Sequence, residues 1–392
     1  MQFEQVKKIG LYICNIIYRC GGTESYTVKI VQSLQHIFPK ADIYFVSELY
    51  SESDSVSDRD FTAKINTLYG TSITPETVHI KFISCSDRNA VQRRIMYKKI
   101  QDSSGDFDLF FYCSRGNFVF KAKKNVTIIH FPVLKIEEQK KIAGSRYFKT
   151  YIRRKDKNYA DKYDLFLPNS KYTESWLKRR WPEINDEKIK LIYPPIIPIE
   201  KTSDIKEKSI LVCSRIERSK KIEVLVEAFK KSAYLAENYA LWIVGGKDAS
   251  DPSYGKELDA LSSGYNIQYY TDVSHEELAR FYNRASFFWH CKGYGTDEEK
   301  DPYKLEHFGV TTVEAMSAGC IPVVISKGGQ KEIVTEGTGF TWNTPAELIR
   351  FTEETAENPQ QMDILSHNAV FRSKDFSMEN FTEQLGRLLQ EI

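Results

Sequence analysis

The chain has 392 residues, of which 41% are hydrophobic and 28% charged, so it is long enough for two globular domains with full cores. This composition is not that of a disordered chain, and no apolar run approaches the length of a transmembrane helix. The net charge of +2 conceals an asymmetry: residues 1–198 contain 33 Lys and Arg against 22 Asp and Glu, a net of +11, whereas residues 199–392 contain 22 against 31, a net of −9.

The basic first part is expected to meet an acidic partner, although a solvated basic face is an equally good interpretation. Nucleic acid is not expected, because no DNA- or RNA-binding motif accompanies the charge. The seven cysteines form no C-x-x-C pair, and Cys113 and Cys213 lie inside apolar runs, as buried thiols do. With no signal-peptide pattern at the start, we expect a cytoplasmic location, with weak peripheral contact to a membrane through the basic part.

The first half alternates strand-like runs with helical patterns. A helix is predicted over Glu24–Phe38, where apolar residues recur at helical spacing. Such alternation predicts a parallel, doubly wound sheet. The predicted strands are short apolar runs at Ile9–Cys14, Asp42–Val46, Val78–Ser84, Asp108–Cys113, Val126–His130, Asp164–Pro168 and Lys190–Tyr193.

A Gly-Gly pair lies between the first strand and this helix. In Gly21-Gly22-Thr23-Glu24 the glycines permit close backbone approach to a phosphate, and the helix start has free N–H groups. Most such pairs are only turns, and the chain contains no G-x-G-x-x-G dinucleotide fingerprint. Gly22 is therefore a candidate phosphate contact on weak local evidence.

Two polar patterns lie at strand ends. His130 ends a predicted strand, where a histidine is more often a structural hydrogen-bond partner than a catalyst. Asp106 and Asp108 match a D-x-D metal-binding pattern, but they open a strand after Ser-Ser-Gly, which is an ordinary strand start. His290 and His307 have no carboxylate at metal-ligand spacing, so no metal site is predicted.

A proline-rich break separates the two halves. The run Tyr193–Pro198 and the polar run Glu200–Lys208 predict a stiff linker, which places the first domain at residues 1–198 and the second at residues 199–374. The second half repeats the alternation of strands and helices. Its predicted strands are Ser209–Cys213, Leu241–Gly245, Ile267–Thr271, Ser286–His290 and Ile321–Ile325, and its predicted helices are Ile222–Ser232, Glu276–Asn283, Val310–Ala318 and Met378–Ile392.

A basic segment follows the first strand of the second half. Ser214–Lys221 contains Arg215 and Lys220, and two cations at a strand end can hold one diphosphate and stabilise charge that develops on it. A solvated basic loop is an equally good interpretation of this segment alone.

Two glutamates eight positions apart are the most informative feature. Glu306 and Glu314 lie on either side of a Phe-Gly turn, and a helix that opens after Gly309 would leave two N–H groups free to attract an anion. Carboxylates accept several hydrogen bonds from sugar hydroxyls. The pattern suggests a sugar, a diphosphate and a ribose in one site, although the helix dipole alone also favours glutamates at a helix start.

These motifs together resemble the E-x7-E signature of the retaining glycosyltransferases of family 4, which have the two-domain GT-B fold. The resemblance is densest from Ile210 to Phe340 and extends in weaker form over nearly the whole chain. It implies an α/β fold of two Rossmann-like domains with doubly wound parallel sheets, facing each other across a cleft. The last helix, within residues 375–392, would cross back onto the first domain.

The resemblance also implies roles for single residues. Glu306 would bind the donor sugar and Glu314 the ribose, with His130 against the sugar and backbone near Val273 against the base. Lys221 stands where the family usually has Gly, which leaves open which lysine reaches the phosphate. The implied contacts to the rest of the donor are Gly22, Arg215, Lys220, Phe308, Gly309, Val310 and Thr311.

The predicted function is transfer of a hexose from a nucleotide diphosphate sugar to a hydroxyl of a glycan or lipid-linked acceptor, by a front-face mechanism without a metal or cofactor. GDP-mannose is favoured as the donor, since Tyr193-Pro194-Pro195 and Glu306-His307-Phe308-Gly309 look most like mannosyltransferase members, and a UDP-sugar is next. The alternatives are an epimerase or hydrolase on the same fold and a non-catalytic nucleotide-sugar-binding protein. A homodimer is a further expectation. The acidic loop Gly293–Tyr303 either covers the donor or is simply solvated.

Overall fold

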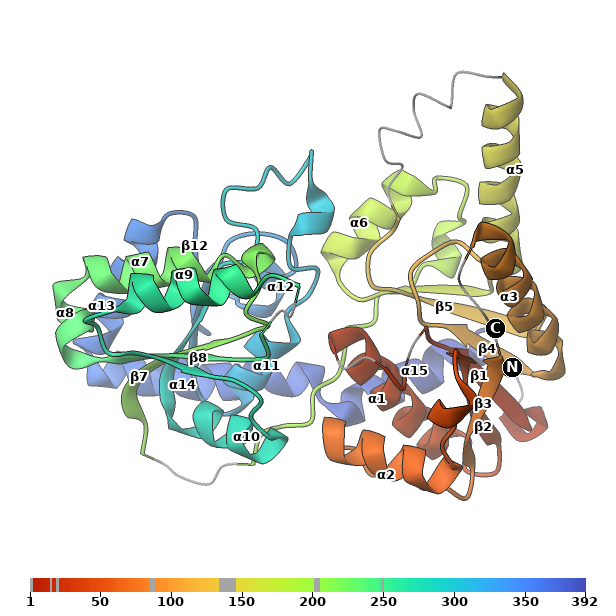
Figure 1. Cartoon of the computed structure of the whole chain (residues 1–392), viewed down its shortest axis with the longest axis horizontal. Coiled ribbons are helices and arrows are strands. Elements are labelled where there is room, and N and C mark those ends of the chain that lie inside the picture. The colour runs from red at the N-terminus through yellow and green to blue at the C-terminus, as the bar shows by residue number, and fades with distance from the viewer. Residues whose placement is uncertain are drawn as a thin grey trace. The chain divides into compact units, whose positions relative to one another are not determined.

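The computed structural model describes residues 3–14, 16–18, 21–84, 89–133, 146–200, 205–247 and 250–392, without the side chains of residues 90 and 146–153. The chain divides into two compact units (Figure 1). The first consists of Met1–Pro195 together with Met378–Ile392, and the second of Ile196–Ser377. Each unit contains a six-stranded sheet.

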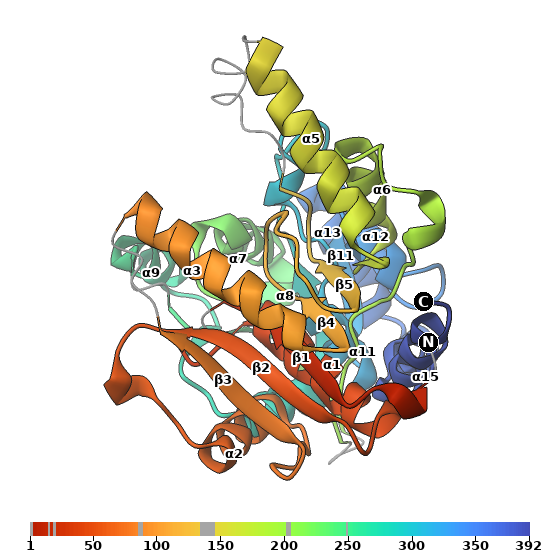
Figure 2. The ribbon, with the colours of Figure 1, turned by 90° about the vertical axis from the view of Figure 1, so that its right-hand side faces the viewer.

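The sheet of the first unit has the strand order β3-β2-β1-β4-β5-β6, and all its neighbouring strands are parallel (Figure 2). Its strands are β1 (Lys8–Tyr12), β2 (Asp42–Leu49), β3 (Val78–Ser84), β4 (Leu109–Tyr112), β5 (Lys124–Ile129) and β6 (Leu165–Pro168). Its helices are α1 (Gly22–Ile37), α2 (Asp58–Tyr69), α3 (Ala90–Ser103), α5 (Arg146–Lys162), α6 (Lys171–Arg180) and α15 (Met378–Gln390).

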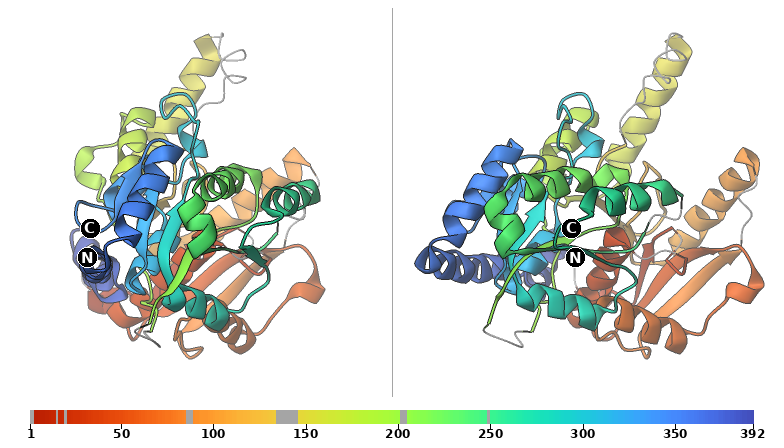
Figure 3. Two further views of the ribbon diagram at one scale, coloured as in Figure 1. Left: turned by 90° about the vertical axis from the view of Figure 1, so that its left-hand side faces the viewer. Right: turned by 60° about the vertical axis from the view of Figure 1, so that its left-hand side comes forward.

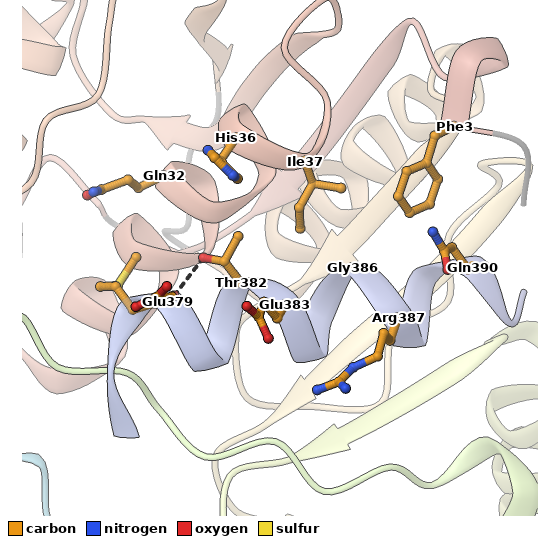
Figure 4. Close-up of a pocket in the computed structure, with 11 residues that line it drawn as sticks. Phe3, Gln32, His36, Ile37, Glu379, Thr382, Glu383, Gly386, Arg387 and Gln390 are labelled. Carbon is orange, nitrogen blue, oxygen red and sulfur yellow. Dashed lines mark hydrogen bonds between the residues drawn. The ribbon is translucent and has the colours of Figure 1, made fainter. Parts of the chain in front are cut away.

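The last helix belongs to the first unit, as predicted. Phe381 and Leu385 of α15 are buried in the core that β1 and α1 also form, and the hydroxyl groups of Ser33 and Thr382 lie 2.8 Å apart. Figure 4 shows α15 alongside α1, with a pocket of about 790 Å³ between them. The α1 residues that line this pocket come from the C-terminal half of that helix, so the pocket lies away from the carboxyl ends of the strands.

The sheet of the second unit has the order β12-β11-β10-β7-β8-β9, and its neighbouring strands are again parallel, with helices around the sheet (Figure 3). Its strands are β7 (Glu207–Cys213), β8 (Ala240–Val244), β9 (Ile267–Tyr270), β10 (Ala285–His290), β11 (Ile321–Ile325) and β12 (Phe340–Trp342). Its helices are α7 (Ile222–Lys231), α8 (Ala233–Asn238), α9 (Pro252–Ser262), α10 (His275–Arg284), α11 (Val310–Ser317), α12 (Gln330–Ile333), α13 (Pro345–Ala356) and α14 (Pro359–Ser373).

Both sheets have the strand order of a Rossmann fold, which reverses direction between β1 and β4 in the first unit and between β7 and β10 in the second. Every residue of β10 and β11 is buried, as expected for parallel strands that helices cover on both faces. Ligands of such sheets bind beyond the carboxyl ends of the strands at the reversal point. The fold therefore confirms the predicted α/β class and indicates where the site should lie in each unit.

Two predicted elements differ from the structure, and one strand was not predicted. Residues 190–193 form no regular strand: the N–H groups of Lys190 and Ile192 bond the carbonyls of Phe166 and Pro168, and the next two residues are prolines, which have no N–H to continue the ladder. The polar run to Lys208 is not all linker, because β7 already begins at Glu207. Strand β12 was not predicted, since three residues are too few to show a periodicity.

Candidate functional site

The carboxyl ends of β7 and β10 bring Lys220 and Glu306 together. Lys220 Nζ lies 2.9 Å from Glu306 Oε2, and both side chains are largely buried, at 16% and 21% exposed. These residues are 86 positions apart in the sequence. The two predicted motifs therefore meet in one site at the reversal point of the second sheet.

Two further basic groups surround the same carboxylate. Glu306 Oε2 lies 3.7 Å from Lys292 Nζ and 3.5 Å from His290 Nε2, at the end of β10. Burial alone would raise the pKa of Glu306, but Lys220, Lys292 and His290 hold that pKa well below its usual range. Burial lowers the pKa of His290, although Glu306 opposes this effect. Two ammonium groups against one carboxylate leave local positive charge, which suits an anionic ligand.

The backbone holds both partners of this ion pair in place. The Cys291 thiol lies 3.2 and 3.0 Å from the carbonyl oxygens of Lys220 and Lys221, so it fastens the lysine-bearing segment to the end of β10. The N–H of Gly329 donates to the carbonyl of Glu306 at 2.9 Å. A Cβ at Gly328 would lie only 2.2 Å from that same carbonyl oxygen, so glycine is required for this close approach.

Helix α11 begins at the other side of this loop. Gly309 precedes it with a φ of +125°, and a Cβ there would lie 2.3 Å from Gln330 Nε2. Because a helix start has no intrahelical acceptors for its first N–H groups, those of Val310 and Thr311 are available to a ligand. Phe308 is 3% exposed and packs against Phe376, so only its backbone could contact a ligand.

Glu314 and Val273 are two further predicted donor contacts in the second unit. The Tyr282 hydroxyl donates to Glu314 Oε2 at 3.1 Å and so orients that carboxylate on α11. Val273 is half-buried in the loop after β9, next to Asp272, whose φ is +58°. The roles predicted for Glu314 and Val273 therefore rest on the resemblance.

The structure separates the cations of the Ser214–Lys221 segment. Arg215 is 70% exposed and pairs with Glu217 at 2.9 Å, so its guanidinium lies in solvent rather than on Glu306. Lys221 has a φ of +59° and precedes α7, and its Nζ lies 3.9 Å from Glu223. Lys220 is therefore the lysine that reaches the site.

Lys221→Gly should raise the free energy of unfolding by up to about 1 kcal/mol, because the left-handed conformation costs a residue with a Cβ about 1–2 kcal/mol and glycine's greater unfolded entropy offsets part of the gain. Urea denaturation of Lys221→Gly, with Lys221→Ala as the comparison, measures this gain in the free energy of unfolding. Equal stability of the glycine and alanine variants would contradict a left-handed conformation at Lys221.

In the first unit, the predicted residues lie at the carboxyl ends of β1 and β5. Gly22 is the first residue of α1, and a Cβ on it would meet no atom within 4 Å, so its backbone is open to a ligand. His130 follows β5, is 9% exposed, and lies 3.0 Å from the carbonyl oxygen of Cys113 through Nε2. Since a carbonyl can only accept, Nε2 carries the proton.

The free energy of unfolding should decrease as the pH falls from about 6.5 to 4, and His130 is one cause. Burial lowers the pKa of His130 to about 4, against about 6.5 in an unfolded chain. Between these values the unfolded chain binds a proton that the folded chain does not, so this group removes about 1.4 kcal/mol of stability per pH unit. Urea midpoints of wild type and His130→Asn from pH 7 to 4 measure the effect; parallel pH profiles would contradict it.

The D-x-D pattern forms ordinary structural contacts. Asp108 Oδ2 accepts hydrogen bonds from the N–H groups of Lys7 and Lys8 at 2.9 and 3.0 Å, and Asp106 pairs with Lys81 at 3.5 Å. The Asp108 contacts lie at the starts of β1 and β4, away from the carboxyl ends of those strands. Within the described part of the chain, no three His, Cys, Asp or Glu side chains gather as metal ligands.

None of the described helices combines the length and apolar character that crossing a bilayer requires.

Sequence reasoning missed Lys292 altogether and considered His290 only as a metal ligand. Both flank Cys291 immediately after β10, a strand that was predicted to end at His290. The sequence did contain a signal for them, because polar residues follow β10 directly. Strand β10 lies next to β7, and these two strands form the reversal point of the sheet, where ligands bind.

The segment that contains this site is similar to known proteins. Residues 196–369, which contain the site of the second unit, match the family model for glycosyl transferases group 1. The chain is 24% identical to alpha-1,3/1,6-mannosyltransferase ALG2 of Rhizomucor pusillus over 330 residues, which are 73% of this chain and 71% of that protein. It is also 24% identical to sucrose synthase 1 of Hordeum vulgare over 231 residues, 55% of this chain but only 28% of that protein.

The fold has relatives among solved structures. The structure of Anabaena HepE in complex with UDP and glucose superposes with a TM-score of 0.70 at 16% identity, covering 98% of this chain and 100% of that one. This likeness concerns the fold alone, and it agrees with two Rossmann-like units of the GT-B type. Residues 196–369 thus match the family model for glycosyl transferases group 1, within a chain that has the GT-B fold.

Proposed function

We propose that the chain is a retaining glycosyltransferase that moves a hexose from a nucleotide diphosphate sugar to an acceptor hydroxyl. The observation that supports this most is the Lys220–Glu306 pair at the reversal point of the second sheet, inside the segment that matches the family model. GDP-mannose is the favoured donor, in keeping with the mannosyltransferase relative, and a UDP-sugar such as UDP-glucose is next, in keeping with the HepE complex.

In this proposal the donor lies along the carboxyl edge of the second unit. Lys220 and the N–H groups of Val310 and Thr311 bind the diphosphate, and Glu306 accepts hydrogen bonds from the sugar hydroxyls. Lys292 joins Lys220 as a second buried cation, while exposed Arg215 moves from Glu217 to the diphosphate when the donor binds. The remaining assignments follow the resemblance: Phe308 and Gly309 by their backbone, Glu314 to the ribose, Val273 near the base, and Gly22 and His130 from the first unit.

Transfer breaks the bond between the anomeric carbon and the diphosphate oxygen, and the bonding electron pair stays on that oxygen. The acceptor hydroxyl forms the new bond on the same face, and the departing diphosphate takes its proton. Negative charge therefore grows on the diphosphate, where Lys220 and the α11 amides stabilise it. These groups supply the positive charge that a metal would otherwise provide, so we propose transfer without a metal or cofactor.

The acceptor is proposed to be a glycan or a lipid-linked glycan on the basic first unit. Part of that charge is used internally: Arg180 makes bidentate contacts with Asp156 at 3.1 and 3.3 Å, and Lys178 pairs with Glu174 at 3.0 Å. Of the basic run from residue 135 to 162, residues 135–145 lie outside the described residues. Peripheral membrane contact through this unit, and a homodimer, remain proposals.

The function is tested by incubating the protein with labelled GDP-mannose or UDP-glucose, with and without glycan acceptors, in buffer containing EDTA. We expect transfer with retained anomeric configuration, and survival of activity in EDTA. Release of free sugar alone would favour a hydrolase, an altered nucleotide sugar an epimerase, and binding without turnover a non-catalytic protein. Activity lost in EDTA and restored by manganese or magnesium would contradict the metal-independent mechanism.

A further inference from the structure

The acidic loop before Glu306, residues 293–303, is held by hydrogen bonds within itself and to a neighbouring turn. Its two ends are held together, because Gly293 has a φ of +102° and a Cβ there would lie 2.5 Å from Leu305 Cδ2. The N–H of Asp301 donates to the carbonyl of Asp297 at 3.0 Å, and the N–H of Glu299 donates to the Asp297 carboxylate at 2.9 Å. The loop therefore has a defined internal structure.

Glu298 joins this loop to the glycine turn that follows β11. Its Oε1 accepts a hydrogen bond from the N–H of Gly328 at 2.9 Å, and its Oε2 lies 3.4 Å from Lys331 Nζ. Lys327 Nζ donates to the carbonyl of Thr296 from the same turn. The loop and the turn are thus fastened to each other by three contacts that involve charged side chains.

The same turn supports the backbone of Glu306. The N–H of Gly329 donates to the Glu306 carbonyl, and Gly328 and Gly329 are close enough that a Cβ on either would collide with a carbonyl oxygen of Glu306 or His307, at 2.2 and 2.3 Å. A continuous set of contacts therefore runs from Glu298 through the glycine turn to the residue that holds Lys220.

We infer that Glu298 is a positioning residue, which holds the Gly328-Gly329 turn against Glu306 and so fixes the Glu306 carboxylate toward the donor sugar. This inference rests on the proposed function, but its structural part does not. Without Glu298 the turn would lose a charge-assisted hydrogen bond and an ion pair, and the Glu306 backbone would lose a fixed support. Lys220 would keep the contact between its backbone carbonyl and the Cys291 thiol, so nucleotide affinity should change less than turnover.

The test compares Glu298→Ala, Glu298→Gln and Lys331→Ala with Glu336→Ala, which changes an exposed glutamate of the same unit. Hydrogen–deuterium exchange is followed in peptides covering residues 326–330, and kcat and nucleoside diphosphate affinity are measured for each variant. We expect Glu298→Ala to speed exchange of this turn at least tenfold and to lower kcat about tenfold, with affinity for GDP and UDP within about twofold of wild type.

Glu298→Gln keeps an oxygen that can accept from Gly328 but loses the charge facing Lys331, so it should give a smaller effect, comparable to that of Lys331→Ala. Glu336→Ala should match wild type. Unchanged exchange in Glu298→Ala would overturn the inference, as would faster exchange with wild-type kcat. If the wild type transfers no sugar from any donor, the proposed function fails, and the exchange measurement still decides whether Glu298 holds the turn.

Discussion

Glu306→Gln should lower turnover by about 100-fold while leaving affinity for a nucleoside diphosphate nearly unchanged. The carboxylate is ionised at working pH, because neighbouring cations hold its pKa well below the usual range. The amide keeps the shape of the side chain but has one neutral acceptor oxygen in place of two charged ones, so it accepts weaker hydrogen bonds from the sugar hydroxyls. A loss of this size is typical of removing one preorganised electrostatic contact from an active site.

The measurement is steady-state kinetics with the preferred donor, together with calorimetric titration with GDP and UDP. Glu336→Gln is the matched control, since it makes the same chemical change at an exposed position of the same unit. Wild-type turnover in Glu306→Gln would remove Glu306 from the site. A parallel loss of nucleotide affinity would instead mean that Glu306 acts mainly by holding Lys220.

Lys220→Ala should weaken nucleoside diphosphate binding roughly ten- to a hundredfold, because a hydrogen bond to a charged group is worth about 1.5–3 kcal/mol. Lys220 is only 16% exposed and lies in the segment after β7, so its charge is poorly screened by water. Arg215→Ala should have a smaller effect on the same titration, since that guanidinium is largely in solvent without a ligand.

Lys221→Ala is the control that separates the two adjacent lysines. The Lys221 side chain is 43% exposed and its ammonium group lies near Glu223, so its loss should leave nucleotide affinity within about twofold of wild type. If Lys221→Ala and Lys220→Ala weaken binding equally, the separation of the two lysines is wrong. If neither does, the segment is a solvated basic loop.

Much of the fold could be predicted from the sequence because the central strands of both sheets, β1, β4, β7 and β10, are largely apolar and buried on both faces. Runs such as Ile321–Ile325 could be placed to the residue, and the α11 start after Gly309 was predicted correctly. The edges of the sheets were harder. Residues 190–193 have the composition of a strand, yet Pro194 and Pro195 end their hydrogen bonding to β6. Whether such a segment forms a strand depends on its pairing with the neighbouring strand as much as on its own composition.

The site was predictable in its motifs but not in its contacts. Lys220 and Glu306 were each predicted from local patterns, whereas their ion pair depends on strands β7 and β10 lying side by side. Lys292 had no motif to mark it. The link from Glu298 to the glycine turn joins residues 30 positions apart, and only tertiary structure shows that a loop of ordinary acidic composition supports Glu306.

The central claim is that the second unit binds a nucleotide diphosphate sugar through Lys220 and Glu306. It is tested most directly by calorimetric titration of the wild-type chain with GDP-mannose, UDP-glucose, GDP and UDP. The account predicts one-site binding of at least one nucleotide sugar together with its nucleoside diphosphate, and weaker binding of both in Lys220→Ala. Absence of binding by every nucleotide sugar at millimolar concentration, or binding that Lys220→Ala leaves unchanged, would contradict it.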